Sequence, residues 1–277
     1  MRGRLLAGRA GHVDASLGLT PAAELLSIAS AVAREAGALL LEHARSAARG
    51  VDSKSTRTDP VSDADRAADA LLTARLRAAF PDDGIVSEES DRVAGSSGRT
   101  WYVDPLDGTV NYLYRIPHWS VSVACADADG GLTGVVYDPL RDELFSAVRG
   151  GGAFLGARRL ATSDVSDPGL ALVATGFSYD SGERAAQAAI VARLAGSVRD
   201  IRRAGSAALD LAWVAAGRID AYFEVSRSAW DTAAGALLVR EAGGDVTWTE
   251  HTEIVASGRP LHARLVALLR ASHQNDR

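Results

Sequence analysis

The segment WYVDPLDGTVNY, residues 101–112, carries an apolar, strand-like run directly into two carboxylates three positions apart, Asp104 and Asp107. Asp, Pro, Gly and Thr are all common in turns. Taken alone, the segment therefore fits a surface turn that ends a strand about as well as it fits the floor of a reactive site. The other acids of the chain decide between these two interpretations.

Carboxylates also follow or begin other predicted elements. Glu88 and Glu89 come after a short apolar run, and Asp231 follows Trp230 where a helix is expected to begin. No Lys or Arg is adjacent in sequence to any of these acids. Carboxylates gathered without cations repel one another and take up protons unless a hard divalent cation holds them. Mg²⁺ suits oxygen ligands and commonly contacts a substrate phosphate, so the acids indicate a site for a metal and a phosphate.

The other residues of the DPLDGT stretch each have a role in such a site. Pro105 restricts the backbone between the two aspartates so that both can point to one place, and the main-chain carbonyl of Leu106 can join them as a ligand. Gly108 permits an unusual dihedral angle or the close approach of a phosphate. Thr109 stands where a helix can start, so its N–H and that of Gly108 can point at an anion while its hydroxyl holds a water.

The composition excludes several other classes of protein. With 277 residues, of which 47% are hydrophobic, the chain is long enough for a sizeable core. A formal net charge of −5 offers no broad cationic surface, so nucleic acid is not expected as the main partner. The single cysteine, Cys125, lies in an apolar run and is expected to be a buried thiol. The sequence contains no apolar segment long enough to cross a bilayer and no recognisable secretory signal, which predicts a cytoplasmic protein.

The N-terminal part of the chain predicts helices. Residues 1–19 are rich in Gly, Arg and Ala without a period and are expected to be a disordered extension. A helix then begins with Thr20 as its N-cap and Pro21 in its first position. A second helix is expected after Ser62, which is a plausible cap for a first turn that contains acids.

The rest of the chain predicts an α+β fold built in layers. Short runs rich in β-branched and aromatic residues predict a mainly antiparallel sheet between residues 84 and 150. The pattern changes near residue 160, which separates an expected N-terminal α+β subdomain, 20–160, holding the metal site from a C-terminal α/β subdomain, 161–277, completing it. The expected strands of the second half are 170–175, 200–205, 220–225 and 245–248, and the expected helices are 183–198, 206–217, 230–244 and 262–272.

These motifs, in this order, resemble the inositol monophosphatase family of lithium-sensitive, Mg²⁺-dependent phosphatases. DPLDGTVN and WDTAAG are the most specific parts of the resemblance. The other matching pieces are KSTRTDPVSDAD at 54–65, SEES at 87–90 and DAYFEVSRSAWDTAAGALLVREAGG at 220–244. The resemblance implies the layered αβαβα sugar-phosphatase fold, Mg²⁺ as cofactor, a homodimer and inhibition by lithium.

At the matching positions, the resemblance implies two Mg²⁺ sites. The first would be held by Glu88, Asp104 and the main-chain carbonyl of Leu106. The second would be held by Asp104, Asp107 and Asp231. The implied mechanism is hydrolysis without a covalent intermediate, in which one metal lowers the pKa of a bound water and the other stabilises the departing ester oxygen.

The resemblance also implies roles for residues around the water. Thr109, assisted by Asp65, would orient the attacking water, and Glu88 would act in catalysis as well as in metal binding. Lys54 is expected near the site as a cation, although a solvated loop lysine is an almost equally good interpretation. Glu89 is expected to lie outside the set of ligands.

Glu224 is the residue expected to choose the substrate. Tyr222 and Glu224 alternate by two along a predicted strand and so point to one face, while Phe223 points to the other. An isolated glutamate at a strand end is most simply solvated, but this strand leads into the helix that carries Asp231. The resemblance implies that the Glu224 carboxylate accepts hydrogen bonds from polyol hydroxyls. The implied substrate-binding set is Asp107, Gly108, Thr109, Ser206, Ala207, Glu224 and Asp231.

The function predicted from these features is the hydrolysis of inositol 1-phosphate to myo-inositol and phosphate. Histidinol phosphate, fructose 1,6-bisphosphate and a broad set of sugar phosphates remain alternative substrates. A non-enzymatic regulator that binds the transcription machinery is an alternative of another class, because some bacterial relatives resembling this chain are thought to act in that way. The acidic composition and the complete set of metal ligands favour the enzyme.

Overall fold

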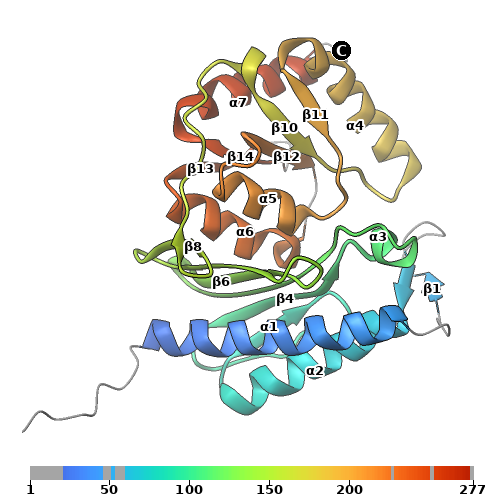
Figure 1. The fold of residues 1–277 in the computed structure, drawn as a ribbon, viewed down its shortest axis with the longest axis vertical. Coiled ribbons are helices and arrows are strands. Elements are labelled where there is room, and N and C mark those ends of the chain that lie inside the picture. The colour runs from blue at the N-terminus through green and yellow to red at the C-terminus, as the bar shows by residue number, and fades with distance from the viewer. Residues whose placement is uncertain (1–20, 46–50, 54–59, 226–227, 250–252, 275–277) are drawn as a thin grey trace, which may run out of the picture.

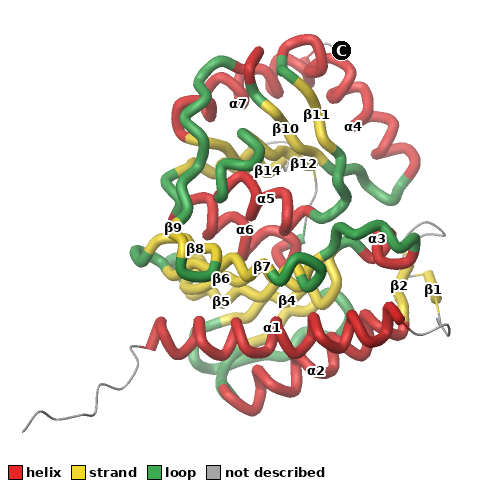
Figure 2. The backbone as a smooth tube through the Cα atoms, in the orientation of Figure 1, coloured by secondary structure: helices red, strands yellow, loops and turns green. Residues whose placement is uncertain are grey.

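The computed structural model describes residues 21–45, 51–53, 60–225, 228–249 and 253–274. The predicted extension of residues 1–19, the predicted cap Thr20 and the predicted site residue Lys54 lie outside the described residues. Helices and sheets alternate in layers, with helices on both outer faces and a further helical layer between two sheets (Figures 1 and 2). The predicted αβαβα layered fold of the α+β class is therefore confirmed.

Two helices, α1 (Pro21–Arg45) and α2 (Asp63–Ala79), form the first layer. α1 begins at Pro21, as predicted, because the first turn of a helix leaves its N–H groups without helical partners and proline has none. Ser62 caps α2: its hydroxyl accepts a hydrogen bond from the Asp65 N–H, and the Asp65 carboxylate accepts one from the Ser62 N–H. This reciprocal pair fixes the Asp65 side chain at the start of α2.

A seven-stranded sheet forms the second layer, in the order β3-β4-β5-β6-β7-β8-β9. Its neighbouring strands are antiparallel except for β3 and β4, so the predicted mainly antiparallel sheet is confirmed. A separate hairpin joins two short strands that the sequence pattern did not predict. The strands are β1 (Val51–Ser53), β2 (Pro60–Ser62), β3 (Gly84–Ser87), β4 (Thr100–Asp107), β5 (Ser120–Asp127), β6 (Gly130–Asp138), β7 (Glu143–Val148), β8 (Gly152–Leu155) and β9 (Arg158–Arg159).

An irregularity in β4 orients the two aspartates of the DPLDG segment. The sequence suggests that the strand gives way to a turn at Asp104, but β4 continues to Asp107. Between these two residues the register with β5 shifts, so that two residues of β4 lie opposite one of β5. Residues three apart on a regular strand point to opposite faces, and the extra residue returns Asp107 to the face of Asp104. Pro105, which has no N–H to donate, is tolerated at this bulge.

The layer between the two sheets consists of α5 (Ala207–Ala215) and α6 (Ala229–Glu241) (Figure 1). α6 lies close to the first sheet because Gly134 of β6 has no side chain: a Cβ there would stand 2.9 Å from the Cα of Ala234. This close packing fixes the start of α6, and with it Asp231, beside the carboxyl end of β4.

The fourth layer is a five-stranded sheet in the order β11-β10-β12-β14-β13, covered on its outer face by α4 (Ser181–Leu194) and α7 (Arg259–Gln274) (Figure 1). The pattern did not predict β14, because its residues EIVASG give little β-strand signal and α7 follows without a turn. As predicted, Tyr222 and Phe223 point to opposite faces of β12, the first packed in the cluster around α5 and α6, the second in the cluster under α4 and α7. The strands are β10 (Leu172–Thr175), β11 (Asp200–Arg202), β12 (Ala221–Val225), β13 (Gly244–Trp248) and β14 (Glu253–Gly258).

Three short elements complete the described chain: α3 (Thr109–Leu113) and two 3₁₀ turns, Pro168–Leu170 and Ala195–Ser197. Cys125 is fully buried in β5, as predicted, and burial raises the pKa of its thiol to about 12. None of the helices in the described residues is both long and apolar enough to span a lipid bilayer.

Candidate active site

Three carboxylates from separate elements meet where β3, β4 and the start of α6 come together. Glu88 directly follows β3, Asp104 lies in β4, and Asp231 lies in the first turn of α6. One oxygen of each lies within 4.8 Å of the others, close enough to hold one metal ion. Asp107 lies outside this group, so the second ligand set expected from Asp104, Asp107 and Asp231 stays a prediction.

Burial and negative charge raise the pKa of Asp104 well above its ordinary value. Asp104 is 1% exposed, and the loss of hydration is the largest cause. The charges of Glu88, Asp107 and Asp231 follow, and all three are negative. A positive charge held among the carboxylates would favour the ionised form of Asp104.

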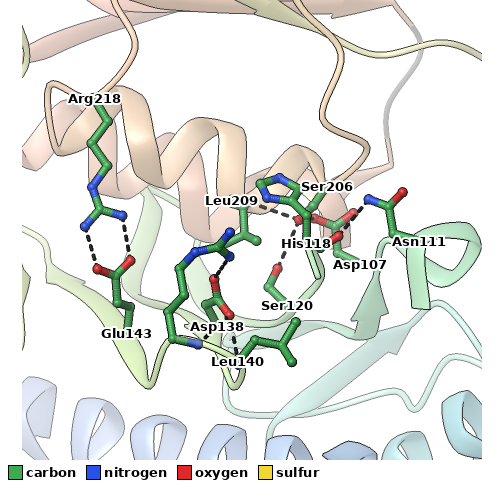
Figure 3. A network of polar contacts seen from close by, with 11 residues as sticks. Asp107, Asn111, His118, Ser120, Asp138, Leu140, Glu143, Ser206, Leu209 and Arg218 are labelled. Atoms are coloured by element: carbon green, nitrogen blue, oxygen red, sulfur yellow. Dashed lines mark hydrogen bonds and ion pairs between the residues drawn. The ribbon is translucent and has the colours of Figure 1, made fainter. Parts of the chain in front are cut away.

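Asp107 binds the start of α5 (Figure 3). Its carboxylate accepts hydrogen bonds from the Ser206 hydroxyl at 2.5 Å and from the N–H groups of Ala208 and Ala207 at 2.7 and 3.3 Å. The pKa of Asp107 is raised to about 6: burial raises it most, the bonds from Ser206 and Ala208 lower it, and the charge of Glu88 raises it. The carboxylate thereby stabilises the positive end of the α5 dipole and ties β4 to the central layer.

Thr109 and Asp65 are joined by a hydrogen bond across 44 positions of sequence. The Thr109 hydroxyl lies 2.9 Å from Oδ1 of Asp65 and 3.1 Å from the carbonyl oxygen of Leu106, and its hydrogen serves one of them at a time. The other Asp65 oxygen accepts hydrogen bonds from the N–H and the hydroxyl of Ser62. Asp65 is therefore a fixed acceptor, and the lone pairs of the Thr109 hydroxyl remain able to accept a hydrogen bond.

Asn111, to which sequence reasoning assigned no role, holds the loop before α5 against this region. Its amide donates a hydrogen bond to the carbonyl of His118 at 2.7 Å (Figure 3) and another to that of Ala204 at 2.8 Å. Gly108 permits the close packing because its φ is +100° and a Cβ would stand 3.1 Å from the His118 carbonyl oxygen. A buried asparagine within the short, otherwise mostly apolar α3 was the available signal.

Ser87 fixes the end of β3 beside Glu88. Its hydroxyl donates a hydrogen bond to the buried carboxylate of Asp69 on α2 and lies 3.2 Å from the carbonyl oxygen of Val103. The Glu88 N–H donates to the same carbonyl at 3.1 Å. The backbone of Glu88 is thus tied to β4 one residue before Asp104.

A pocket that is open to solvent adjoins the carboxylates. All the residues predicted to bind substrate, except Thr109, line it. The pattern gave no signal for the loop after β10, for Arg203 or for Asp210, because these residues reach the pocket only through the folding of the second sheet. The lining residues that were not predicted are Thr175, Gly176, Phe177, Tyr179, Arg203, Gly205 and Asp210.

Glu224 lies deep in this pocket and is 4% exposed. The Tyr222 hydroxyl donates a hydrogen bond to its carboxylate, so the two side chains share a face of β12 as predicted. Gly176 lies directly against it, since a Cβ there would stand 2.1 Å from the Glu224 carboxyl. Burial, followed by the charges of Asp107 and Glu224, raises the pKa of the nearby Asp210 well above its ordinary value. The pocket is therefore rich in hydrogen-bonding carboxyl groups.

A second polar network supports α5 away from the carboxylates (Figure 3). Arg218 forms two hydrogen bonds with Glu143, at 2.5 and 2.6 Å, and Arg141 binds Asp138 at 2.5 Å. Burial lowers the pKa of His118 to about 4, so its imidazole is neutral at physiological pH. The Arg218–Glu143 pair joins β7 to the segment just after α5, whereas the Arg141–Asp138 pair links the end of β6 to the turn before β7.

Comparison with known proteins places these features in context. A sequence model of the inositol monophosphatase family matches residues 22–275. The Nus factor SuhB of Escherichia coli (strain K12) is 43% identical over 225 residues, which cover 80% of this chain and 84% of that protein. The Nus factor SuhB of Xylella fastidiosa is 46% identical over 215 residues, which cover 77% of this chain and 78% of that protein.

Solved structures share the fold over most of their length. The extragenic suppressor protein suhB from Bartonella henselae superposes with a TM-score of 0.83 at 38% identity, covering 90% of this chain and 98% of that chain. The inositol monophosphatase from Anabaena superposes with a TM-score of 0.77 at 35% identity, covering 90% of this chain and 95% of that chain.

Proposed function

The chain belongs to the inositol monophosphatase family, and from this premise we propose that it is a Mg²⁺-dependent phosphatase that hydrolyses inositol 1-phosphate to myo-inositol and phosphate. The observation that carries the proposal is the group formed by Glu88, Asp104 and Asp231, whose oxygens lie within 4.8 Å of one another. A fixed hydroxyl–carboxylate pair and a pocket with hydrogen-bonding side chains adjoin this group.

The donor set fits a hard divalent cation. The three carboxylates offer only oxygen ligands, and burial, followed by repulsion from the neighbouring carboxylates, raises the pKa of Asp104. Glu88, Asp104 and Asp231 would hold the ion, and Asp107 and the Leu106 carbonyl are the further oxygen donors of the proposal. When bound, Mg²⁺ supplies Lewis-acid activation of water and neutralises charge on the phosphate.

Thr109 and Asp65 are proposed to position the attacking water. Because the Thr109 hydroxyl donates to Asp65, its lone pairs are oriented to accept a hydrogen bond from a water in the site. Asp65 is the acceptor toward which the hydroxyl proton shifts, and Ser62 holds it in place through its other oxygen. This arrangement is that of a general base acting through an intervening hydroxyl.

Glu224→Gln is expected to lower kcat/KM for inositol 1-phosphate by about 10- to 100-fold. The loss follows because a hydrogen bond from a polyol hydroxyl to a charged acceptor contributes about 1.5–3 kcal/mol. The kcat/KM for p-nitrophenyl phosphate, which has no polyol hydroxyls, should fall much less. Steady-state phosphate release with both substrates measures the difference.

Two further variants separate the role of Glu224 from a general loss of structure. Tyr222→Phe removes the hydroxyl that binds the carboxylate but keeps its charge. Asp142→Asn is a matched acid-to-amide control, because Asp142 is exposed, lies in the turn between β6 and β7, and does not line the pocket. Equal losses on both substrates in Glu224→Gln would assign Glu224 to the metal site or to the fold.

Stabilisation by Mg²⁺ is expected to fall as the pH drops below about 6. The pKa of Asp107 is raised to about 6 and that of Asp104 is raised as well, so protons compete with the metal. For each carboxylate proton that Mg²⁺ must displace, the apparent Mg²⁺ affinity falls about tenfold per pH unit below the pKa of that carboxylate. For the metal-free protein the sign is opposite: a raised folded-state pKa gives stability that is present below about pH 4 and lost as the pH rises through about 6.

Thermal unfolding between pH 5 and pH 8, with Mg²⁺ or with EDTA, measures this effect. Taking the difference in unfolding temperature between the two conditions at each pH cancels the contribution of titrating groups outside the site, such as His118. A Mg²⁺-induced shift of the unfolding temperature that stays constant across this range would contradict the assignment.

Phosphate release from a panel of esters tests the proposed substrate. Inositol 1-phosphate should give a higher kcat/KM than histidinol phosphate, fructose 1,6-bisphosphate and p-nitrophenyl phosphate. A higher value for one of the others would reassign the substrate while keeping the phosphatase chemistry. The same assay with LiCl against KCl tests the lithium sensitivity that belongs to this proposal.

The names of the bacterial relatives favour a second candidate function. Because they are called Nus factors, a regulator that binds the transcription machinery is the alternative to consider. The complete carboxylate group supports the enzyme, since a scaffold does not require it. A homodimer in the cytoplasm remains part of either proposal, and sedimentation of the purified protein measures its assembly.

A further inference from the structure

A groove with a cavity volume of about 320 Å³ runs along α6 beside β4 and β5 and shares no lining residue with the pocket at the carboxylates. Alanines of the sheet and the helix, such as Ala124 and Ala233, leave the space open. Its larger side chains are aromatic or cationic: Tyr102 of β4, Trp248 at the end of β13 and Arg240 near the end of α6. A concave space of this volume, mostly apolar with a few polar groups, is typical of a small-molecule site.

Three hydrogen-bond donors line the groove and have no partner among the described residues. Within the part of the chain that the structure describes, no hydrogen bond or ion pair engages the side chain of Tyr102, Arg240 or Trp248. Trp248 is 48% exposed, so its indole ring is not part of the hydrophobic core. Unpaired donors on an open aromatic surface are groups that a ligand can satisfy.

The charge around Arg240 favours an anion. Three acids adjoin lining residues in sequence: Asp231, which belongs to the carboxylate group, and Asp127 and Glu241, whose carboxylates are already engaged. Asp127 forms an ion pair with Arg149 at 2.7 Å, and Glu241 accepts hydrogen bonds from two glycine N–H groups of the β7–β8 turn at 2.8 Å each. Arg240 is the cation among the lining residues and its charge is not neutralised by these neighbours.

We propose that this groove is a second ligand site, which binds a small planar aromatic molecule that carries one acidic group. The ring stacks on the Trp248 indole above the alanines of the groove. The acidic group accepts charge-assisted hydrogen bonds from Arg240. The Tyr102 hydroxyl donates to a polar atom of the ligand.

The groove adjoins the catalytic group yet keeps the ligand's charge away from it. Tyr102 and Asp104 lie two residues apart on one face of β4, and Ala229, at the start of α6, also lines the groove. Arg240 follows Asp231 by nine residues, which is roughly 14 Å along the helix axis. An anion at Arg240 therefore avoids the carboxylates, while the ligand contacts both elements that carry them.

Calorimetric titration of the full chain with naphthalene-2-sulfonate, in the presence of Mg²⁺ and saturating inorganic phosphate, tests this site. One saturable site is expected. Arg240→Gln should weaken binding about 10- to 100-fold, because it removes a charged donor, and should leave the neutral naphthalene-2-sulfonamide unaffected. Trp248→Leu should weaken the binding of both compounds. Arg66→Gln, a matched substitution of an exposed arginine on α2, should change neither.

Four results would overturn the proposal, the last of them with a variant that fills the groove. The first is the absence of saturable binding, and the second is equal affinity of the parent and Arg240→Gln for the sulfonate. The third concerns Trp248→Leu: its affinity for both compounds is unchanged, but its molecular mass in sedimentation differs from that of the parent. This result would make the surface a contact between copies of the chain. Ala233→Leu fills the groove; provided that its circular dichroism and unfolding temperature match the parent, continued binding of the sulfonate would place the ligand elsewhere.

Discussion

Asp104→Asn is expected to lower kcat/KM for inositol 1-phosphate by about 10³-fold or more, since charge stabilisation by a bound metal contributes several kcal/mol. Asp104 is the most buried of the three grouped acids and receives the repulsion of the other carboxylates. The amide has nearly the same shape but loses the charge that would hold the ion. The effect should therefore come from the metal and not from packing.

The same substitution should stabilise the metal-free protein. Removing one charge from a buried acidic group relieves repulsion, and each kcal/mol gained raises the unfolding temperature by about 2–4 °C for a chain of this size. Mg²⁺ should then add little further stability. Unfolding scans with EDTA or Mg²⁺, combined with phosphate release, give both readouts from one preparation.

Asp104 is a sharper test of the metal than Asp107. Asp107 accepts hydrogen bonds from Ser206 and from two N–H groups at the start of α5. An amide at this position would turn its NH₂ group toward donors, so Asp107→Asn would disturb the helix start as well as any metal. If Asp104→Asn retained parental activity at limiting Mg²⁺ and an unchanged Mg²⁺ stabilisation, the carboxylate group would not be the metal site.

Thr109→Ala is expected to lower kcat by about 10²-fold or more with little change in KM, which is the scale for loss of a positioned proton acceptor. The substitution removes the hydroxyl that contacts Asp65 and the Leu106 carbonyl while leaving the carboxylates in place. Thr109→Ser keeps the hydroxyl and should restore most of kcat. If the loss of the methyl group were the cause, Thr109→Ser would lose as much kcat as Thr109→Ala, because both variants lack that methyl group.

Asp65→Asn completes the test of this pair. If Asp65 acts through Thr109, combining Asp65→Asn with Thr109→Ala should cost little more than Thr109→Ala alone, because the two residues act as one unit. Additive losses would show separate roles. A large rise in KM with unchanged kcat in Thr109→Ala would assign the residue to phosphate binding.

Much of the fold follows from local sequence. Pro21 and Ser62 mark helix starts because capping depends on neighbouring residues alone. The alternation of Tyr222, Phe223 and Glu224 is a property of a single strand and predicts which of them share a face. The same locality explains why β14 was missed, because that strand is stabilised by pairing with β12 and β13 and not by its own composition.

The sequence by itself determined which chemical groups this protein carries: acids at the ends of strands and at a helix start, a threonine after a glycine, and no adjacent cations. Only the tertiary structure decided which distant residues these groups contact and which of them line the pocket. Asp107 reaches a helix start 99 positions later, Asn111 binds a loop 93 positions later, and Arg203 and Asp210 enter the pocket through the second sheet. The reason is physical: residue type and spacing fix local geometry, whereas the partner of a buried polar group depends on which distant segment the packed core brings within hydrogen-bonding distance.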